Sequence, residues 1–95
     1  MLVINLHFPD AGSLKGKRKE LSSIKAQLQG RLGVAVAETG YQDLWQRATL
    51  TAALTGGSLR RLAATADEVE RWVLARCPDG ATIERLVASV EDLRG

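Results

Sequence analysis

The sequence predicts one α+β domain of two layers, in which helices cover one face of an antiparallel sheet. Two observations lead to this fold class. Three short stretches carry the alternating or β-branched pattern of strands, whereas two longer stretches repeat apolar residues at the three- and four-residue spacing of helices. The chain has 95 residues, which suits a single domain over residues 1–95 with one core.

The first strand is predicted over residues 2–8, where Leu, Ile, Leu and Phe alternate with Val, Asn and His. Pro9 and Gly12 follow and end it. Ser13 then stands at the N-cap position of a first helix over residues 13–32. Its hydroxyl can accept a hydrogen bond from an amide of the first turn, and apolar residues repeat at helical spacing behind it.

A hairpin is predicted next. Residues 34–38 form its short first strand, and residues 44–55, with alternation and several threonines, form its longer second strand. Glu38 and Arg47 are candidates for an ion pair across this hairpin. Strict alternation places them on opposite faces, so the pair would need an odd loop register or a bulge.

Ser58 is predicted to cap a second helix over residues 58–77. The pattern of residues 81–93 fits a helix or a strand. Because the five preceding elements make up most of a split β-α-β sandwich, whose sheet gains a fourth strand at this point, we assign 81–93 to a strand. The predicted core is Ile4, Leu6, Leu21, Ile24, Leu28, Val36, Leu50, Leu54, Leu62, Val69 and Val73.

Residue types argue against catalysis. A single cysteine, Cys77, excludes an internal disulfide and a zinc site of several thiolates, which fits a reducing compartment. Without a basic leader or a run of about 18 apolar residues, we expect a cytoplasmic protein that does not enter the membrane. The only histidine, His7, falls in the opposite layer from Cys77. Lacking also a phosphate-binding glycine loop and metal-ligand spacing, the chain is expected to be no enzyme and to hold no cofactor or metal.

Two segments carry a family resemblance. Residues 13–18 read Ser-Leu-Lys-Gly-Lys-Arg, and residues 38–48 read Glu-Thr-Gly-Tyr-Gln-Asp-Leu-Trp-Gln-Arg-Ala. Over essentially the whole chain the sequence resembles the YlxP-like family, bacterial domains of unknown function. Gly16 departs from the family pattern, which usually has Glu there, the residue that a capping box would use. The resemblance implies a ferredoxin-like β-α-β-β-α-β fold and a bacterial cytoplasmic protein often encoded beside ribosome-binding factor A. It implies no established activity.

Positive charge is concentrated in the first predicted helix. Six basic residues and one acid lie between Lys15 and Arg31, so this segment carries +5 and the rest of the chain −3. Such a band suits phosphate groups, although a solvated helix face has the same composition. Lys17 falls near the apolar stripe, so its stem should follow the core while its ammonium stays at the rim. The candidate nucleic-acid-binding residues are Lys15, Lys17, Arg18, Lys19 and Lys25.

A second candidate site lies on the sheet face that the helices leave open. If alternate residues of the strand 44–55 point to the helices, Trp45 and Arg47 point the other way, beside Asn5 and His7 on the neighbouring central strand. RNA-recognition domains of this topology stack unpaired bases on aromatics there, but their sequence signature is absent here. A lone tryptophan on an open sheet face is equally typical of a dimer contact.

These observations do not identify a function by themselves. Our hypothesis is a non-catalytic accessory protein that binds RNA or a ribonucleoprotein in bacterial translation or ribosome maturation. The alternative is a protein-interaction or self-association module, including a homodimer, that uses the open sheet face. A small enzyme ranks third. The response to salt separates the first two, because phosphate contacts weaken steeply with salt and apolar contacts do not.

Overall fold

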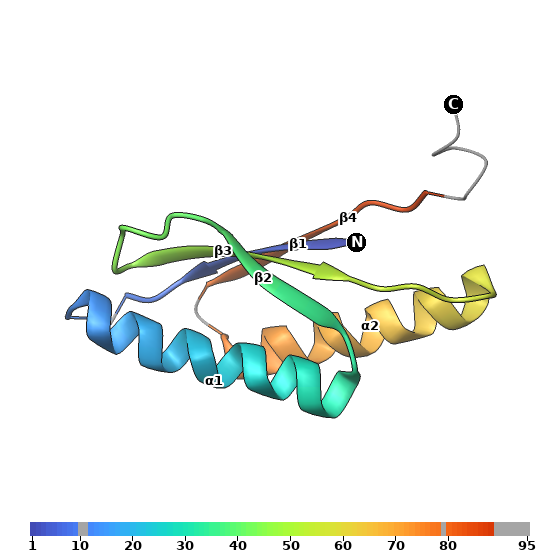
Figure 1. Ribbon diagram of the computed structural model, residues 1–95, viewed down its shortest axis with the longest axis horizontal. Helices are drawn as coiled ribbons and strands as arrows, with labels where there is room; N and C mark the ends of the chain where they lie inside the picture. The colour runs from blue at the N-terminus through green and yellow to red at the C-terminus, as the bar shows by residue number, and fades with distance from the viewer. Residues whose placement is uncertain (10–11, 79, 89–95) are drawn as a thin grey trace.

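Six elements follow one another in the predicted order β-α-β-β-α-β in the computed structural model, which describes residues 1–9, 12–78 and 80–88. They are β1 (Leu2–His7), α1 (Leu14–Leu32), β2 (Ala35–Gly40), β3 (Arg47–Ala53), α2 (Leu59–Arg76) and β4 (Ala81–Arg85). All strand pairs are antiparallel, in the order β2-β3-β1-β4, so β1 and β3 are the central pair. Figure 1 shows both helices on the same face of the sheet. The ferredoxin-like α+β sandwich is thereby confirmed.

The core lies between the sheet and the helices. Ile4 pairs with Leu50 across the two central strands, and both point toward the helices and are fully buried. Ile24 of α1 and Val69 of α2 meet them from the other layer and are fully buried too. The predicted core is confirmed, except that three of its members are half-buried: Val36, Leu54 and Leu62.

Both helices begin at the predicted caps. The Ser13 Oγ accepts a hydrogen bond from the Gly16 amide (3.1 Å), and the Ser58 Oγ accepts one from the Arg61 amide (3.4 Å). These bonds satisfy donors that have no partner inside the helix. The first helix ends at Gly33, whose φ of 66° is left-handed and therefore suits glycine.

The third strand is shorter than predicted. The expected strand covered 44–55, whereas β3 covers Arg47–Ala53, so Trp45 precedes the strand instead of lying within it. The reason lies in the partner strand. β1 ends at His7, opposite Arg47, and the following Pro9 has no amide N–H to continue the ladder. The loop before β3 therefore leaves the sheet.

The last strand is confirmed as a strand. β4 pairs antiparallel with β1 over Ala81–Arg85, which settles the ambiguity between helix and strand there. Residues 86–88 lie beyond the strand, and the remainder of the predicted strand, residues 89–93, lies outside the described residues.

Arg85 fastens the end of β4 to α2. Its guanidinium donates to both carboxylate oxygens of Glu70 (2.7 and 2.9 Å) and to the Asp67 Oδ1 (2.6 Å). These hydrogen bonds hold the pKa of both carboxyls below its ordinary value and raise the pKa of Arg85. A carboxyl whose pKa is lowered by folding stabilises the folded state only while it is ionised.

Replacing Arg85 with Gln should therefore make the free energy of unfolding depend less on pH in the acid range. In the unmodified chain, stability should fall as the pH drops from about 5 to about 3, because Asp67 and Glu70 take up protons more readily once unfolded. The variant should lose stability near neutral pH and show a shallower fall over the same range. Urea unfolding midpoints across this pH range measure both, with exposed Arg60→Gln as control. Equal slopes for Arg85→Gln and Arg60→Gln would contradict the role given to Arg85.

Candidate functional site

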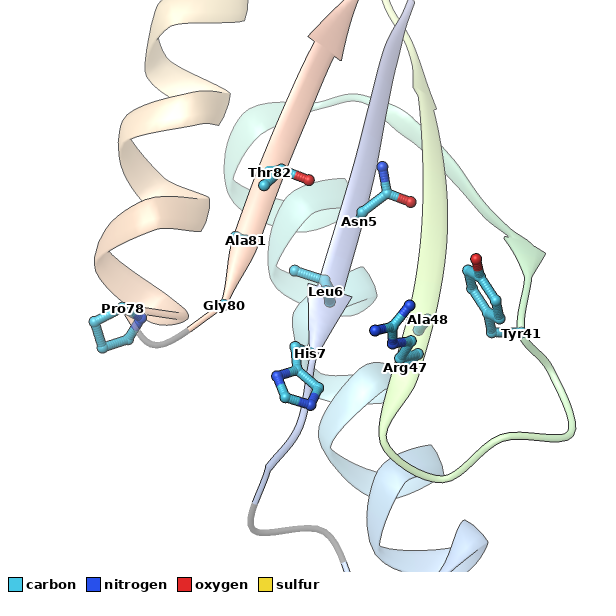
Figure 2. Close-up of a pocket in the computed structure, with 10 residues that line it drawn as sticks. All are labelled: Asn5, Leu6, His7, Tyr41, Arg47, Ala48, Pro78, Gly80, Ala81 and Thr82. Atoms are coloured by element: carbon cyan, nitrogen blue, oxygen red, sulfur yellow. The ribbon is translucent and has the colours of Figure 1, made fainter.

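The open face of the sheet carries a hollow of about 650 Å³. Figure 2 shows its lining residues along β4, β1 and β3, with Tyr41 to one side. Three strands and two connections contribute to it, because β1, β3 and β4 all reach this end of the sheet. Its polar side chains are Asn5, His7, Tyr41, Arg47 and Thr82.

Strand register brings these side chains together. His7 lies opposite Arg47 in the β1–β3 pair, and Asn5 lies opposite Thr82 in the β1–β4 pair. Since alternate residues of a strand share a face, Asn5 and His7 both project away from the helices. The Thr49 Oγ1 donates to the Asn5 Oδ1 (2.8 Å), which fixes the orientation of the amide. The structure thus unites three of the four residues predicted for the open face.

The turn between α2 and β4 forms one wall of the hollow. The His7 amide donates to the Gly80 carbonyl (2.8 Å), so the two backbones run close together. A Cβ placed on Gly80 would lie 2.7 Å from the Cβ of His7, nearer than such atoms approach. Glycine at this position is therefore what allows the wall to close on the His7 side chain.

Tyr41 forms the opposite wall. It follows β2 directly, its φ of 58° is left-handed, and its side chain is 49% exposed. The Arg47 guanidinium lies over the Tyr41 ring, 6.0 Å from its centroid, at the outer limit of a cation–π contact. Arg47 and Tyr41 together present a cation beside an aromatic face.

Lys17 connects this wall to the first helix. Its side chain is only 1% exposed, and its Nζ donates to the Tyr41 carbonyl (2.5 Å) and lies 3.4 Å from the Glu38 Oε2. The expectation that the Lys17 ammonium stays at the rim is wrong, because a carbonyl and a carboxylate from the hairpin receive it inside the protein. Lys17 is therefore not part of the exposed basic surface.

The hairpin turns Glu38 inward and away from Arg47. Glu38 lies opposite the buried Leu50, on the helix-facing side of the sheet, and the pairing with β3 shifts by one residue between Glu38 and Gly40. A bulge is present, as an ion pair with Arg47 would have required, but the carboxylate faces Lys17 instead. The extra residue, Thr39, shares a hydrogen bond with the Thr51 Oγ1 (2.9 Å).

A smaller hollow of about 240 Å³ lies in the loop before β3. Arg47 lines it together with Trp45, which is 48% exposed, so Arg47 belongs to both hollows. Trp45 thus lies in the loop that precedes β3, whereas the prediction placed it within the strand. The signal for this placement was local, since the run from Gly40 to Asp43 is rich in turn residues.

The remaining basic residues lie on the surface of α1. Glu20 pairs with Arg76 of α2 (3.6 Å), which fixes the flank of α1 that faces α2. At 100° per residue, Arg18 and Lys25 lie on the other flank, facing away from α2 toward the β2 side of the domain. Lys15, Arg18 and Lys19 are exposed and Lys25 is half-exposed.

Cys77 and the acidic side chains bear on thiol and metal chemistry. Burial raises the pKa of the Cys77 thiol, so little of it is the nucleophilic thiolate at neutral pH. Residues 1–9, 12–78 and 80–88 contain no group of three or more His, Cys, Asp or Glu side chains that could hold a metal ion. Within the same ranges, neither helix has the length and apolar character needed to cross a membrane.

Comparison with known proteins identifies the family of this chain. The model of a family described as protein of unknown function (DUF503) matches residues 1–89. The chain belongs to the DUF503 family. It is 39% identical over 82 residues to the uncharacterized protein YlxP of Bacillus subtilis (strain 168), an alignment that covers 86% of this chain and 85% of YlxP. No solved structure matches it. The YlxP-like resemblance is therefore confirmed.

In this DUF503 chain, the two segments that predicted the family meet in space. Lys17 lies in residues 13–18, and its two partners, Glu38 and Tyr41, lie in residues 38–48. The contact joins the start of α1 to the connection between β2 and β3, which lie at the same end of the molecule in Figure 1. The motifs thus describe one structural unit.

Sequence reasoning missed Tyr41, Gly80 and Thr82 as parts of the site. Tyr41 lies in a loop, where its carbonyl accepts a hydrogen bond from Lys17, and Gly80 lies where two backbones run close together. Neither feature follows from a periodic sequence pattern. Thr82 could have been found, because alternation from the predicted strand places it on the open face.

Substituting Gly80 with Ala should destabilise the domain by about 1–3 kcal/mol, the usual cost of forcing extra volume into a packed site. The new Cβ would meet the Cβ of His7, which cannot swing aside as the end of a long side chain can. Chemical denaturation measures the change. Gly57→Ala is the matched control, because nothing lies within 4 Å of a Cβ there. A Gly80→Ala variant as stable as the control would contradict the tight wall.

Proposed function

We propose that this DUF503 domain is a non-catalytic accessory module that binds single-stranded RNA, free or within a ribonucleoprotein. The observation that carries the proposal is the position of Arg47. Its side chain lines both hollows, with Tyr41 beside it in one and Trp45 beside it in the other. A cation between two half-exposed rings suits a nucleic-acid strand, whose bases stack on aromatic faces while its phosphates approach cations.

The shape of the open face supports the same ligand. The central strands present the short side chains of Asn5, Thr49 and Thr51 there, which leave room for an extended strand to lie along the sheet. His7 and Arg47 at the end of this surface can donate hydrogen bonds to phosphate oxygens. The stacking groups come from the β2–β3 loop, which differs from the sheet-borne aromatics of RNA-recognition domains.

Charge on the first helix extends this surface. Arg18 and Lys25 lie on the β2 side of α1, and the β2–β3 loop is attached to the same helix through Lys17. Lys15 and Lys19 add positive potential on the outer surface of the helix. A strand that leaves the loop therefore meets a positive surface, which attracts phosphates over a distance of about 8–10 Å at ordinary salt concentrations.

Fluorescence anisotropy with labelled single-stranded RNA of mixed sequence, measured over a series of salt concentrations, tests the proposal. The logarithm of the binding constant should fall linearly with the logarithm of salt concentration. Arg47→Gln should lower the slope by about 0.7, and the triple replacement of Lys15, Arg18 and Lys19 by Gln should lower it by about two. Trp45→Ala should weaken binding by about 1–3 kcal/mol and leave the slope nearly unchanged.

Arg60→Gln is the matched control, since Arg60 is an exposed arginine at the start of α2. This helix begins at the end of the molecule opposite the β2–β3 loop (Figure 1). Arg60→Gln should change binding least. Absence of binding at the lowest salt concentration would reject the proposal. If sedimentation then showed a dimer that Trp45→Ala dissociates, self-association through the exposed Tyr41, Leu44 and Trp45 would replace it.

A further inference from the structure

We propose that Lys17 is a positioning residue for the candidate site: its buried ammonium sets the conformation of the β2–β3 loop, residues 41–46, and thereby the shape of both hollows. Its effect on RNA affinity rests on the proposed function. The conformational role does not, because it concerns contacts inside the free protein.

The Tyr41 carbonyl is the centre of this arrangement. It accepts one hydrogen bond from the Lys17 Nζ (2.5 Å) and another from the Leu44 amide (3.1 Å), which closes the turn from Tyr41 to Leu44. One oxygen thus ties the loop to itself and to the helix. A bond from a charged donor is stronger than one between neutral groups, so the lysine contact is the firmer of the two.

The backbone conformation at the start of the loop requires a stabilising contact. Tyr41 is the one non-glycine residue with a left-handed φ among the described residues. Side chains with a Cβ disfavour this conformation, which persists only where the surroundings hold it in place. Lys17 donates to the carbonyl of that same residue, so the hydrogen bond stabilises the residue whose backbone conformation is unfavourable.

Glu38 keeps the ammonium at this place. Its Oε2 is buried, lies 3.4 Å from the Lys17 Nζ, and has no hydrogen-bond partner among the described residues. An ammonium inside a protein requires a nearby opposite charge, and here the carboxylate comes from the strand that leads directly into Tyr41. Both partners of Lys17 therefore belong to the hairpin.

The consequence for the site is geometric. Tyr41 lines the larger hollow, and the loop that begins with it delivers Trp45 to the smaller one. Lys17 also precedes Arg18 in α1, so the contact sets the loop next to the positive flank of the helix. Lys17 thus acts on a ligand through Tyr41 and touches none itself.

Amide exchange with solvent at Leu44, measured by nuclear magnetic resonance on the free protein, tests the role. Lys17→Met keeps most of the stem and removes the ammonium. The Leu44 amide should exchange roughly tenfold faster in this variant, beyond any change at Leu50 in the β1–β3 ladder, because the loop opens independently of the sheet. Lys19→Met, at an exposed position of the same helix, should alter neither amide.

Glu38→Gln provides a second variant, which preserves shape and removes only the charge. It should raise exchange at Leu44 by less than Lys17→Met does, again without matching change at Leu50. Should Lys17→Met fail to fold, Glu38→Gln decides the question. Exchange at Leu44 that only follows Leu50 would show that Lys17 is structural without positioning the loop, and would overturn the inference.

The two proposals fail separately. Selective loosening of the loop together with no RNA binding by the unmodified chain keeps the positioning role and rejects the RNA ligand. If the unmodified chain binds RNA, Lys17→Met should weaken binding at least as much as Trp45→Ala, although Lys17 is buried. RNA affinity unchanged in a variant with a loosened loop would contradict the link between loop conformation and the site.

Discussion

The ammonium of Lys17 lies inside the protein, 2.5 Å from the Tyr41 carbonyl and 3.4 Å from the Glu38 carboxylate. A charge in that position is costly unless it is paired and hydrogen-bonded, and both partners come from an element distant in sequence. The first helix and the hairpin are therefore compatible in only one arrangement at this end of the molecule. Apolar contacts permit small sliding of one layer over another, whereas a buried ion pair does not satisfy its groups in a shifted register.

The two ends of the sandwich are held by different means. At the loop end, one buried lysine joins α1 to the hairpin, and the side chains of the candidate site lie around it. At the other end, Arg85 joins β4 to α2 through the exposed carboxylate of Asp67 and the half-buried one of Glu70. This arrangement contributes modestly because water screens it. The half-exposed rings of Tyr41 and Trp45 lie at the firmly held end. A binding surface made by a loop needs such support, because loops are otherwise the most mobile part of a fold.

Periodic features of the fold were predictable from sequence. The alternation in residues 2–8 and the helical spacing behind Ser13 and Ser58 gave the elements, because burial of one face imposes these periods. The same reasoning placed Asn5, His7 and Arg47 on the open face. The fourth strand followed from topology instead, since the pattern of its residues fits a helix equally well.

The features that were not predicted from sequence depend on contacts between distant segments. Helical spacing placed Lys17 at the edge of the apolar stripe, but whether a long side chain ends in solvent or inside depends on what the facing element offers. Here the hairpin offers a carbonyl and a carboxylate. The shortened β3 follows from where β1 ends, and the site glycine from how closely two backbones approach. None of these has a signature within its own segment.

The most direct test of the central contact observes the lysine ammonium groups themselves, in a heteronuclear spectrum recorded near neutral pH. Ammonium protons of exposed lysines exchange with water too fast to be detected, whereas buried and hydrogen-bonded ones persist. A buried Lys17 ammonium should give a distinct signal, with a nuclear Overhauser contact to the backbone of Tyr41 or Leu44, while the signals of Lys15 and Lys19 are lost. Loss of the Lys17 signal together with theirs would place its ammonium in solvent and contradict the account.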